Sequence, residues 1–476
     1  MGFSTVIFIF VFFPICIGLF YLFRVIERKA GLEKFRLPDI FLTLASVAFY
    51  GWVGLRDFFG LLIYVALVFL MGRLIRGGSK GRLNLTICLV VLIGILYYFK
   101  YYDFSASVIF DFTGMDFSIE QTWVMAGISF ITFSAISYLI DIYRGNVGRG
   151  GVLDVALYLT FFPKVISGPI VLWKDFSALM KAREFSVGNF VEGIDRIIIG
   201  LCKKVILADT FGALITDIQS QTGGSMDVIT AWGCAFLYFL QIYYDFAGYS
   251  DVALGLSKMF GFNLKENFNF PYISQSITEF WRRWHISLGT WFREYVYIPL
   301  GGNRKGFKRT LFNLFVVFFV TGIWHGAGWG YLCWGMMHGA CVIVERCFKG
   351  KSFYEKIPAG VKWIVTMFIV MIGWEFFRLG SFSETLEFIK TMFGIVGFEN
   401  INFTFRYYFS AKIIILMIIA TAGATVLGTG WMQQRKETFA NSGGYIVKQA
   451  VYMVLFVVAI LFMVNSTYSP FIYFQY

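Results

Sequence analysis

Long apolar runs recur along almost the whole chain, and short polar segments separate them. The hydrocarbon core of a bilayer is about 30 Å thick and needs about 20 residues of helix to cross it, so each run near that length predicts a transmembrane helix. The pattern therefore predicts an all-α polytopic membrane protein with about 11–13 transmembrane helices. The clearest runs are residues 3–23, 83–99, 123–142, 229–246, 361–377, 413–429 and 451–464, and the shorter or weaker ones are 40–55, 58–71, 197–215, 311–324 and 331–344.

Basic residues fall in alternate loops between these runs, as the positive-inside rule requires of cytoplasmic loops. They follow the first, third and fifth runs, whereas loop 100–120 holds one lysine against four acidic residues and is expected outside. Positive charges come after run 3–23 rather than before it, which is the wrong order for a cleaved secretory signal. We therefore expect a multi-pass protein of the cell (inner) membrane whose first span enters from outside.

The stretch 150–204 departs from this pattern because Pro163, Gly168 and Pro169 interrupt its short apolar piece. We expect a re-entrant or surface-lying element there, with its backbone satisfied by other helices or by water. The stretch 263–309 is the longest polar segment and is also expected on the cytoplasmic side, so the middle of the chain predicts a central vestibule or tunnel. No repeat or linker divides the sequence, which predicts a single integral membrane domain over residues 1–476.

Composition supports a lipid environment and excludes several classes of protein. Apolar residues make up 58% of the chain and charged residues only 15%, whereas soluble proteins reach about 45–50% apolar residues even with glycine counted. The formal net charge of +12 belongs to cytoplasmic loops in this interpretation, and the basic segments lack the aromatic interleaving of a strand-binding surface, so no nucleic acid partner is expected. The seven cysteines are scattered without a C-x-x-C pair, which predicts neither a disulfide framework nor a metal site.

The chain has only three histidines. His325 ends the run 311–324, at a depth where ionisable groups are costly and mark functional pathways. At helical spacing it shares a face with Thr321 and Gly322, which leave space beside the ring. An imidazole has a reference pKa of about 6.5, so it can take a proton from a hydroxyl as a general base. The alternative is a histidine that only packs between helices, and this is the role that we expect of His338.

Ser276 and Glu279 form a capping box, which predicts that a helix begins near residue 277. The apolar and polar positions over 277–295 fall on opposite arcs, as in an amphipathic helix that lies in the membrane interface. His285 lies at the edge of the buried arc. It is either poised between the protein and the vestibule or a core histidine hydrogen-bonded to a backbone carbonyl.

Four charged residues are further candidates for the site. Arg282 and Arg283 lie on the polar arc, where they can hold the phosphates of a cytoplasmic donor or pair with lipid headgroups or with Glu279. Asp245 and Asp251 close an apolar run and can orient an imidazole, although neutralising the arginines of the vestibule is the more expected role. Motifs of the common soluble hydrolases, nucleotide-binding proteins and zinc proteases do not occur.

Four stretches of the sequence resemble a known family. They are FFPKVISGPI (161–170), the segment 241–254, NFNFPYISQSITEFWRRWHISLGTWFREYVYIPLGGNRKG (267–306) and TGIWHGAGWGYLCWGMMHG (321–339). Together they resemble the membrane-bound O-acyltransferases, and within them the bacterial alginate O-acetyltransferase branch. The resemblance covers about 143–346, which we expect to be the catalytic core.

The resemblance implies acyl transfer from a cytoplasmic thioester, acetyl-CoA or an acyl carrier, to a hydroxyl across the membrane, with no bound cofactor. His325 in Trp324-His325-Gly326 matches the family's invariant catalytic histidine, and His285 matches its second histidine. Trp324, Thr321 and the four charged candidates are expected to contact substrate. The segment LGGNRK (300–305) is similar to the polysaccharide O-acetylation branch, in which an extracytoplasmic acyltransferase partner often completes the transfer.

Other functions stay open at this stage. One is D-alanyl-type transfer to a cell-wall polymer, another is a proton-coupled transporter or flippase, and a third is a noncatalytic scaffold that docks a surface partner. A covalent acyl-histidine relay is a second chemical route for the enzyme. Release of thiol from a labelled thioester in a His325-dependent reaction separates the enzyme from the transporter.

Overall fold

The computed structural model describes residues 2–75, 77–117, 123–222, 225–396, 401, 403–430, 432, 444–465 and 471. Residues 118–120 of the predicted outside loop 100–120 are not among them. The chain divides into two compact units. The first unit comprises Met1–Gly200, Tyr249–Lys265 and Met463–Gln475, and the second comprises Leu201–Gly248 and Glu266–Phe462.

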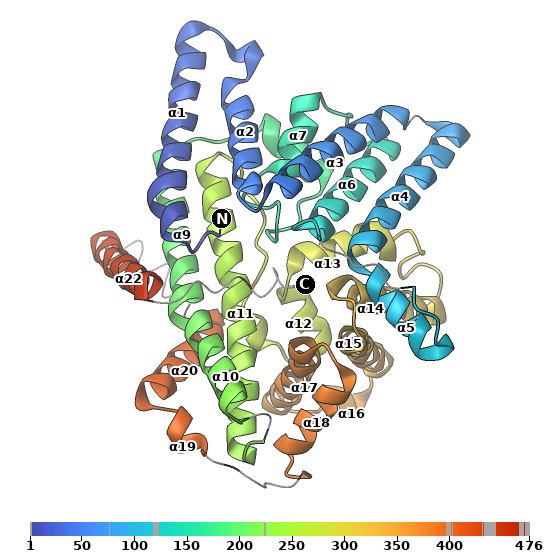
Figure 1. Cartoon of the computed structure of the whole chain (residues 1–476), viewed down its shortest axis with the longest axis vertical. Coiled ribbons are helices and arrows are strands. Elements are labelled where there is room, and N and C mark those ends of the chain that lie inside the picture. Colours follow the sequence, from blue (N-terminus) through green and yellow to red (C-terminus); the bar gives the residue numbers. More distant parts are fainter. Residues whose placement is uncertain are drawn as a thin grey trace. The chain divides into compact units, whose positions relative to one another are not determined.

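Helices make up the regular structure of the first unit, and Figure 1 labels most of them. Their bounds are η1 Phe8–Phe12, α1 Phe13–Ala30, η2 Glu33–Phe35, α2 Leu37–Gly51, α3 Leu55–Leu74, α4 Gly78–Lys100, α5 Tyr102–Thr113, α6 Ile128–Tyr143, α7 Val152–Thr160, α8 Trp173–Lys181 and α9 Val187–Leu201. Helix α6 is buried on almost every side and packs against α3 and α4. Gly72 permits the approach of α3, because a Cβ atom there would lie 2.4 Å from the Tyr138 hydroxyl oxygen.

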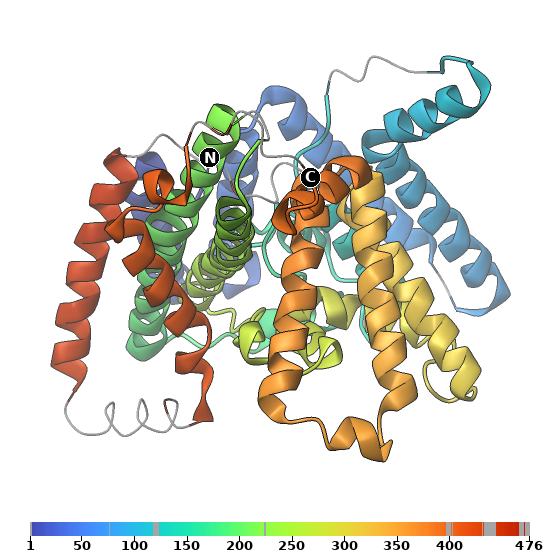
Figure 2. The same cartoon turned by 90° about the horizontal axis from the view of Figure 1, so that it is seen from below.

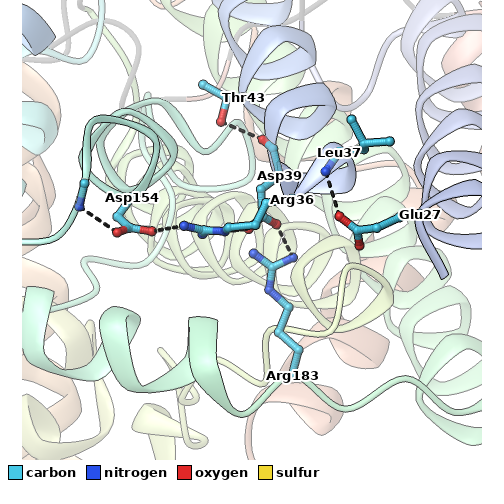
Figure 3. A network of polar contacts seen from close by, with 8 residues as sticks. Glu27, Arg36, Leu37, Asp39, Thr43, Asp154 and Arg183 are labelled. Atoms are coloured by element: carbon cyan, nitrogen blue, oxygen red, sulfur yellow. Dashed lines mark hydrogen bonds and ion pairs between the residues drawn. The ribbon is translucent and has the colours of Figure 1, made fainter. Parts of the chain in front are cut away.

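An ion network joins the start of α2 to two other parts of the first unit (Figure 3). The Arg36 guanidinium contacts Asp39 at 2.7 Å and Asp154 of α7 at 2.5 Å, and Arg183 contacts Asp39 at 2.6 Å. The Glu27 carboxylate accepts a hydrogen bond from the backbone N–H of Leu37 at 2.8 Å. Oppositely charged groups that are part-buried together satisfy each other, so the network fixes the turn between α1 and α2.

The irregular segment between α7 and α8 is buried throughout, over residues 161–172. Side chains of other helices satisfy its ends, since Ser46 Oγ accepts from the backbone N–H of Phe162 at 3.1 Å and Ser137 Oγ accepts from that of Trp173 at 2.9 Å. Helices α7 and α8 have nine residues each, too few to cross a bilayer. Neither α7 nor α8 can cross a bilayer alone, and the re-entrant or surface-lying element stays a prediction for this part of the chain.

The second unit is also helical, and the described residues of the chain contain no β-strand. The bounds are η3 Cys202–Ala208, α10 Asp209–Thr222, α11 Val228–Met259, η4 Pro271–Ile273, α12 Ile277–Arg283, α13 Ile286–Phe292, η5 Arg293–Tyr297, α14 Phe307–His325, α15 Trp329–Phe348, α16 Ser352–Glu355, α17 Ala359–Leu379, α18 Phe382–Met392, α19 Phe405–Tyr408, α20 Ala411–Ala424, η6 Val426–Gly428 and α22 Tyr445–Asn465. Helices α14, α15 and α17 pack side by side (Figure 2). A Cβ atom on Gly335 would lie 2.6 Å from the carbonyl oxygen of Phe318, so α14 and α15 need glycine at their crossing.

Seven helices within the described residues are long and apolar enough to cross a membrane, and each coincides with a predicted run. They are Phe8–Ala30, Leu55–Leu74, Gly78–Lys100, Phe307–His325, Ala359–Leu379, Ala411–Gly428 and Tyr445–Asn465. The other predicted runs are helical too, but they are shorter, like α2 and α6, or carry more polar residues, like α11 and α15. The all-α, multi-pass membrane class is therefore confirmed, whereas the count of about 11–13 spans stays a prediction.

Candidate active site

His325 is the last residue of α14 and is buried in the second unit, with 4% of its surface exposed. Its imidazole contacts the aromatic rings of Trp324, Trp334 and Phe377, at centroid distances of 4.8, 4.8 and 5.3 Å. These rings come from α14, α15 and α17. The neighbouring Gly326 ends the helix with an extended backbone. The packing of three helices therefore fixes the position of this imidazole.

Thr321 lies one turn before His325 and is also buried. Its hydroxyl donates to the carbonyl oxygen of Val317 in its own helix at 2.7 Å. A threonine hydroxyl that donates to the carbonyl oxygen four residues earlier has its hydrogen bond satisfied within its own helix. Trp324 is buried as well and contacts His325 by its ring. The sequence prediction thus brings together three residues that the structure also groups at the end of α14.

His338 of α15 is fully buried among rings, as expected of a packing residue. Its ring centroid lies 5.3 Å from that of Trp281 and 5.4 Å from that of Trp334, while Phe280 stacks parallel to it at 6.4 Å. Trp334 contacts both His325 and His338. The two histidines therefore belong to one aromatic cluster formed by α12, α14, α15 and α17.

The predicted continuous helix over 277–295 is wrong, because the chain breaks at His285. Helix α12 ends at Arg283, Trp284 is extended, and His285 takes a left-handed conformation (φ 43°, ψ 53°) before α13 begins. His285 is 1% exposed rather than at the edge of a vestibule. A positive φ is uncommon for a residue with a side chain, so contacts from elsewhere must hold this turn.

Asn267 makes those contacts, although the sequence analysis did not single it out. Its backbone oxygen accepts from the N–H of Ile286 at 2.9 Å, and its side-chain Oδ1 accepts from the N–H and hydroxyl of Ser287 at 3.2 and 2.8 Å. The same Oδ1 lies 3.2 Å from His285 Nδ1. The buried Asn267 side chain therefore accepts hydrogen bonds from the turn and also contacts the imidazole of His285.

Helix α12 is anchored at its other end by Glu345 from α15. The Glu345 carboxylate accepts from the backbone N–H groups of Ile277 and Thr278 at 2.5 and 2.9 Å, and from the Thr278 hydroxyl at 2.7 Å. Ser276 Oγ accepts from the N–H of Glu279 at 3.0 Å, which confirms the predicted N-cap. Negative charge at a helix N-terminus is stabilising. Glu345 and the Ser276 cap therefore hold the first turn of α12 together.

The charged candidates have different surroundings. Arg283 Nε donates to Glu279 at 2.9 Å, and its Nη1 donates to the carbonyl oxygen of Asn269 at 3.1 Å, so this guanidinium supports the turn. Arg282 is exposed. The pairing of Arg283 with Glu279 is the alternative that the sequence analysis left open.

Asp245 and Asp251 belong to different units, although both lie on α11. Asp245 is buried in the second unit and contacts Lys204 Nζ at 2.6 Å, which in turn contacts Asp209 at 2.7 Å. Asp251 contacts Arg196 at 2.8 Å within the first unit. Both carboxylates are thus paired with basic side chains. The sequence analysis did not identify Lys204 because it lies in the apolar run 197–215. A lysine inside such a run indicates a buried ion pair, and this signal was available in the sequence.

A continuous path of ring contacts connects His285 with His325. Phe246 contacts His285 edge-on at 4.7 Å, and Phe268 follows it at 5.1 Å. The path continues from Phe268 to Trp284 at 5.0 Å, from there to Trp374 at 4.8 Å, and through Phe377 to His325. This path therefore gives His285 and His325 a shared apolar setting.

Burial lowers the pKa of His285 to about 3, so its imidazole is neutral at physiological pH. A neutral imidazole can accept a proton.

A cavity of about 260 Å³ in the second unit lies between α11, α17 and α20, and its lining residues are apolar rings, methionines and small side chains. No histidine is among these lining residues, so the predicted passage to His325 stays a prediction.

These features are those of a helical membrane protein with a buried histidine site. The family model of the membrane-bound O-acyltransferase family, MBOAT, matches residues 82–379, and the chain belongs to this family. It is therefore a membrane acyltransferase. The match includes all the candidate site residues, the segment around Asn267 and the whole aromatic cluster.

Curated relatives extend this comparison. The chain is 40% identical to the probable alginate O-acetylase AlgI of Pseudomonas aeruginosa, over 83% of this chain and 75% of that protein. It is 35% identical to the probable alginate O-acetylase AlgI of Pseudomonas putida over the full length of both. It is 32% identical to the peptidoglycan O-acetyltransferase of Helicobacter pylori, over 83% of this chain and 80% of that protein. The resemblance to the alginate O-acetyltransferase branch is thereby confirmed.

Proposed function

We propose that this acyltransferase passes an acetyl group from a cytoplasmic thioester to a hydroxyl of an extracytoplasmic polysaccharide or of a partner protein. The names of the relatives, alginate O-acetylase and peptidoglycan O-acetyltransferase, support an acetyl group and a saccharide acceptor. Basic residues in alternate loops support the orientation, and the inner membrane is part of the proposal. Acetyl-CoA or an acyl-carrier thioester is the proposed donor.

The position and burial of His325 are the observation that supports this proposal. His325 lies at the end of an apolar helix, is buried among rings from three helices, and falls within residues 82–379, which the family model matches. An ionisable group among apolar side chains at membrane depth is costly and marks a functional site by default. The described part of the chain contains no group of three or more His, Cys, Asp and Glu side chains that could hold a metal ion.

The proposed reaction is a direct acyl transfer. The acceptor hydroxyl oxygen attacks the thioester carbonyl, so that a C–O bond forms and the C–S bond breaks. His325 takes the hydroxyl proton during attack and returns it to the departing thiolate, which leaves as the thiol. Rings around the imidazole exclude water, which protects the thioester from hydrolysis.

The remaining candidates take secondary roles in this proposal. Arg282 is exposed and cationic, which suits contact with the phosphates of the donor. Arg283, held by Glu279, positions the turn that carries His285. An extracytoplasmic acyltransferase that receives the acetyl group is the proposed partner, and membrane lipid surrounds the apolar helices.

Reconstitution in liposomes tests the proposal. Protein given labelled acetyl-CoA on the cytoplasmic side, and alginate oligosaccharide as acceptor probe on the other, should release thiol and form a labelled ester. His325→Ala should lower both rates by about 10²–10⁴. His338→Gln is the matched control, because it removes a buried imidazole that only packs. Unchanged turnover in His325→Ala, or flux of a substrate without ester formation, would overturn the proposal.

A further inference from the structure

The turn between α12 and α13 contains a polar cluster that the aromatic cluster does not explain. It consists of Asn267, His285 and Ser287, and the first two are 0% and 1% exposed. Three contacts of hydrogen-bond length converge on Asn267 Oδ1, from the N–H and the hydroxyl of Ser287 and from His285 Nδ1. Such a buried polar cluster defines which atoms donate and which accept.

The orientation of the Asn267 amide follows from Ser287. The backbone N–H of Ser287 can only donate, so the amide atom 3.2 Å from it must be the oxygen and not the nitrogen. The Ser287 hydroxyl has a single hydrogen and gives it to the same oxygen at 2.8 Å. Both side-chain oxygens beside the imidazole are therefore acceptors.

His285 Nδ1 faces these two acceptors, at 3.2 Å from Asn267 Oδ1 and 3.4 Å from Ser287 Oγ. A nitrogen lone pair in that place would repel the amide oxygen, whereas an N–H would bond to it. A neutral imidazole holds one proton, so a proton on Nδ1 leaves Nε2 with the lone pair. The orientation of the Asn267 amide therefore determines the tautomer of His285.

We propose that Asn267 is a positioning residue that holds His285 as the Nδ1–H tautomer, so that Nε2 keeps the lone pair with which it can accept a hydrogen bond. This rests on the proposed function for its consequence in catalysis, but not for the tautomer itself. The backbone of Asn267 also holds the left-handed turn, because its carbonyl oxygen accepts from Ile286. Orientation and tautomer therefore come from one residue.

Nuclear magnetic resonance of the full chain in nanodiscs, with labelled histidine, measures the tautomer directly. The chain has three histidines, so single substitution of each assigns the signals. Protonated and unprotonated ring nitrogens resonate at well-separated frequencies, and couplings to the ring carbons distinguish Nδ1 from Nε2. The expected result is a protonated Nδ1 on His285, and a protonated Nε2 would overturn the proposal.

Variants test the role of Asn267. Asn267→Leu removes the acceptor at similar size, and the Nε2–H tautomer should gain population while kcat falls on the order of a hundredfold at nearly constant KM. Asn267→Asp keeps an acceptor oxygen and should retain the Nδ1–H tautomer. Asn269→Ala is the matched control, because that residue is exposed in the same segment and uses its backbone for hydrogen bonding.

The outcomes separate the two proposals. An Nδ1–H tautomer that Asn267→Leu leaves unchanged contradicts the role of Asn267, even if both proteins transfer acetyl groups. The expected tautomers without acetyl transfer by the wild-type protein contradict the proposed function and leave the inference on Asn267 intact. If Asn267→Leu does not fold, the wild-type tautomer and Asn267→Asp still decide.

Discussion

The two regions that carry His325 and His285 are held in different ways. His325 closes a regular helix of 19 residues, and rings of three helices surround it. His285 lies at a break between two helices of seven residues each, and its turn depends on hydrogen bonds from Asn267 and on the anchoring of α12 by Glu345. Rings pack against both imidazoles, and the turn at His285 depends in addition on polar contacts.

This difference predicts different failures. Loss of a ring from the aromatic cluster leaves a cavity and lowers stability, because protein interiors are close-packed. Loss of a partner in the polar turn leaves buried donors without acceptors. Packing changes should therefore act on the whole second unit, and polar changes should act first on α12 and α13.

Trp334→Ala should have the largest effect on stability. The ring is 1% exposed and contacts His325, His338 and Trp374. Truncation of such a residue costs about 3–5 kcal/mol because a cavity remains. Thermal unfolding in detergent measures the loss, and Trp329→Ala, on a half-exposed residue of the same helix, is the control. Equal stability of the two variants would contradict a close-packed cluster.

Glu345→Ala should have the next largest effect, confined to the polar region. It removes the acceptors for two backbone N–H groups and one hydroxyl at the start of α12. Hydrogen bonds to a charged group contribute about 1.5–3 kcal/mol. Hydrogen exchange at Ile277 and Thr278 should accelerate, while exchange in α14 stays as in the wild type. Acceleration in both regions alike would show that they are not held separately.

The apolar pattern was enough to predict the fold class and the helix that ends at His325. Its helix follows from a run of apolar residues, and its end follows from Gly326, so local signals suffice. The turn at His285 could not be predicted in this way. Its positive φ contradicts the helical periodicity of the segment, and its main partner lies 18 residues away in an irregular stretch. The side-chain roles of Asn267 and Glu345 depend on tertiary contacts that no local pattern encodes.

The lowered pKa of His285 predicts that the stability of the protein depends on pH. Its pKa is about 3 in the folded protein and about 6.5 in the unfolded chain, which therefore binds more protons below pH 6.5. The stability that this residue contributes is complete above that pH and falls as the pH drops toward 3. Between pH 7 and pH 5 the loss is about 2 kcal/mol. His285→Gln should reduce the acid-induced loss of thermal stability by this amount, and an unchanged loss would contradict a neutral, buried ring.

Ser276→Ala should have the smallest effect and sharpens the comparison within α12 itself. The hydroxyl oxygen accepts one hydrogen bond, from the N–H of Glu279 at 3.0 Å, and removal of such a cap costs about 1 kcal/mol. Glu345 still holds the first turn in this variant, so exchange should accelerate at Glu279 and less at Ile277. Acyl transfer should stay close to the wild-type rate, because the contacts of Asn267 with His285 are intact. A loss of activity as large as that of Asn267→Leu would mean that the start of α12, rather than Asn267, determines how His285 is held.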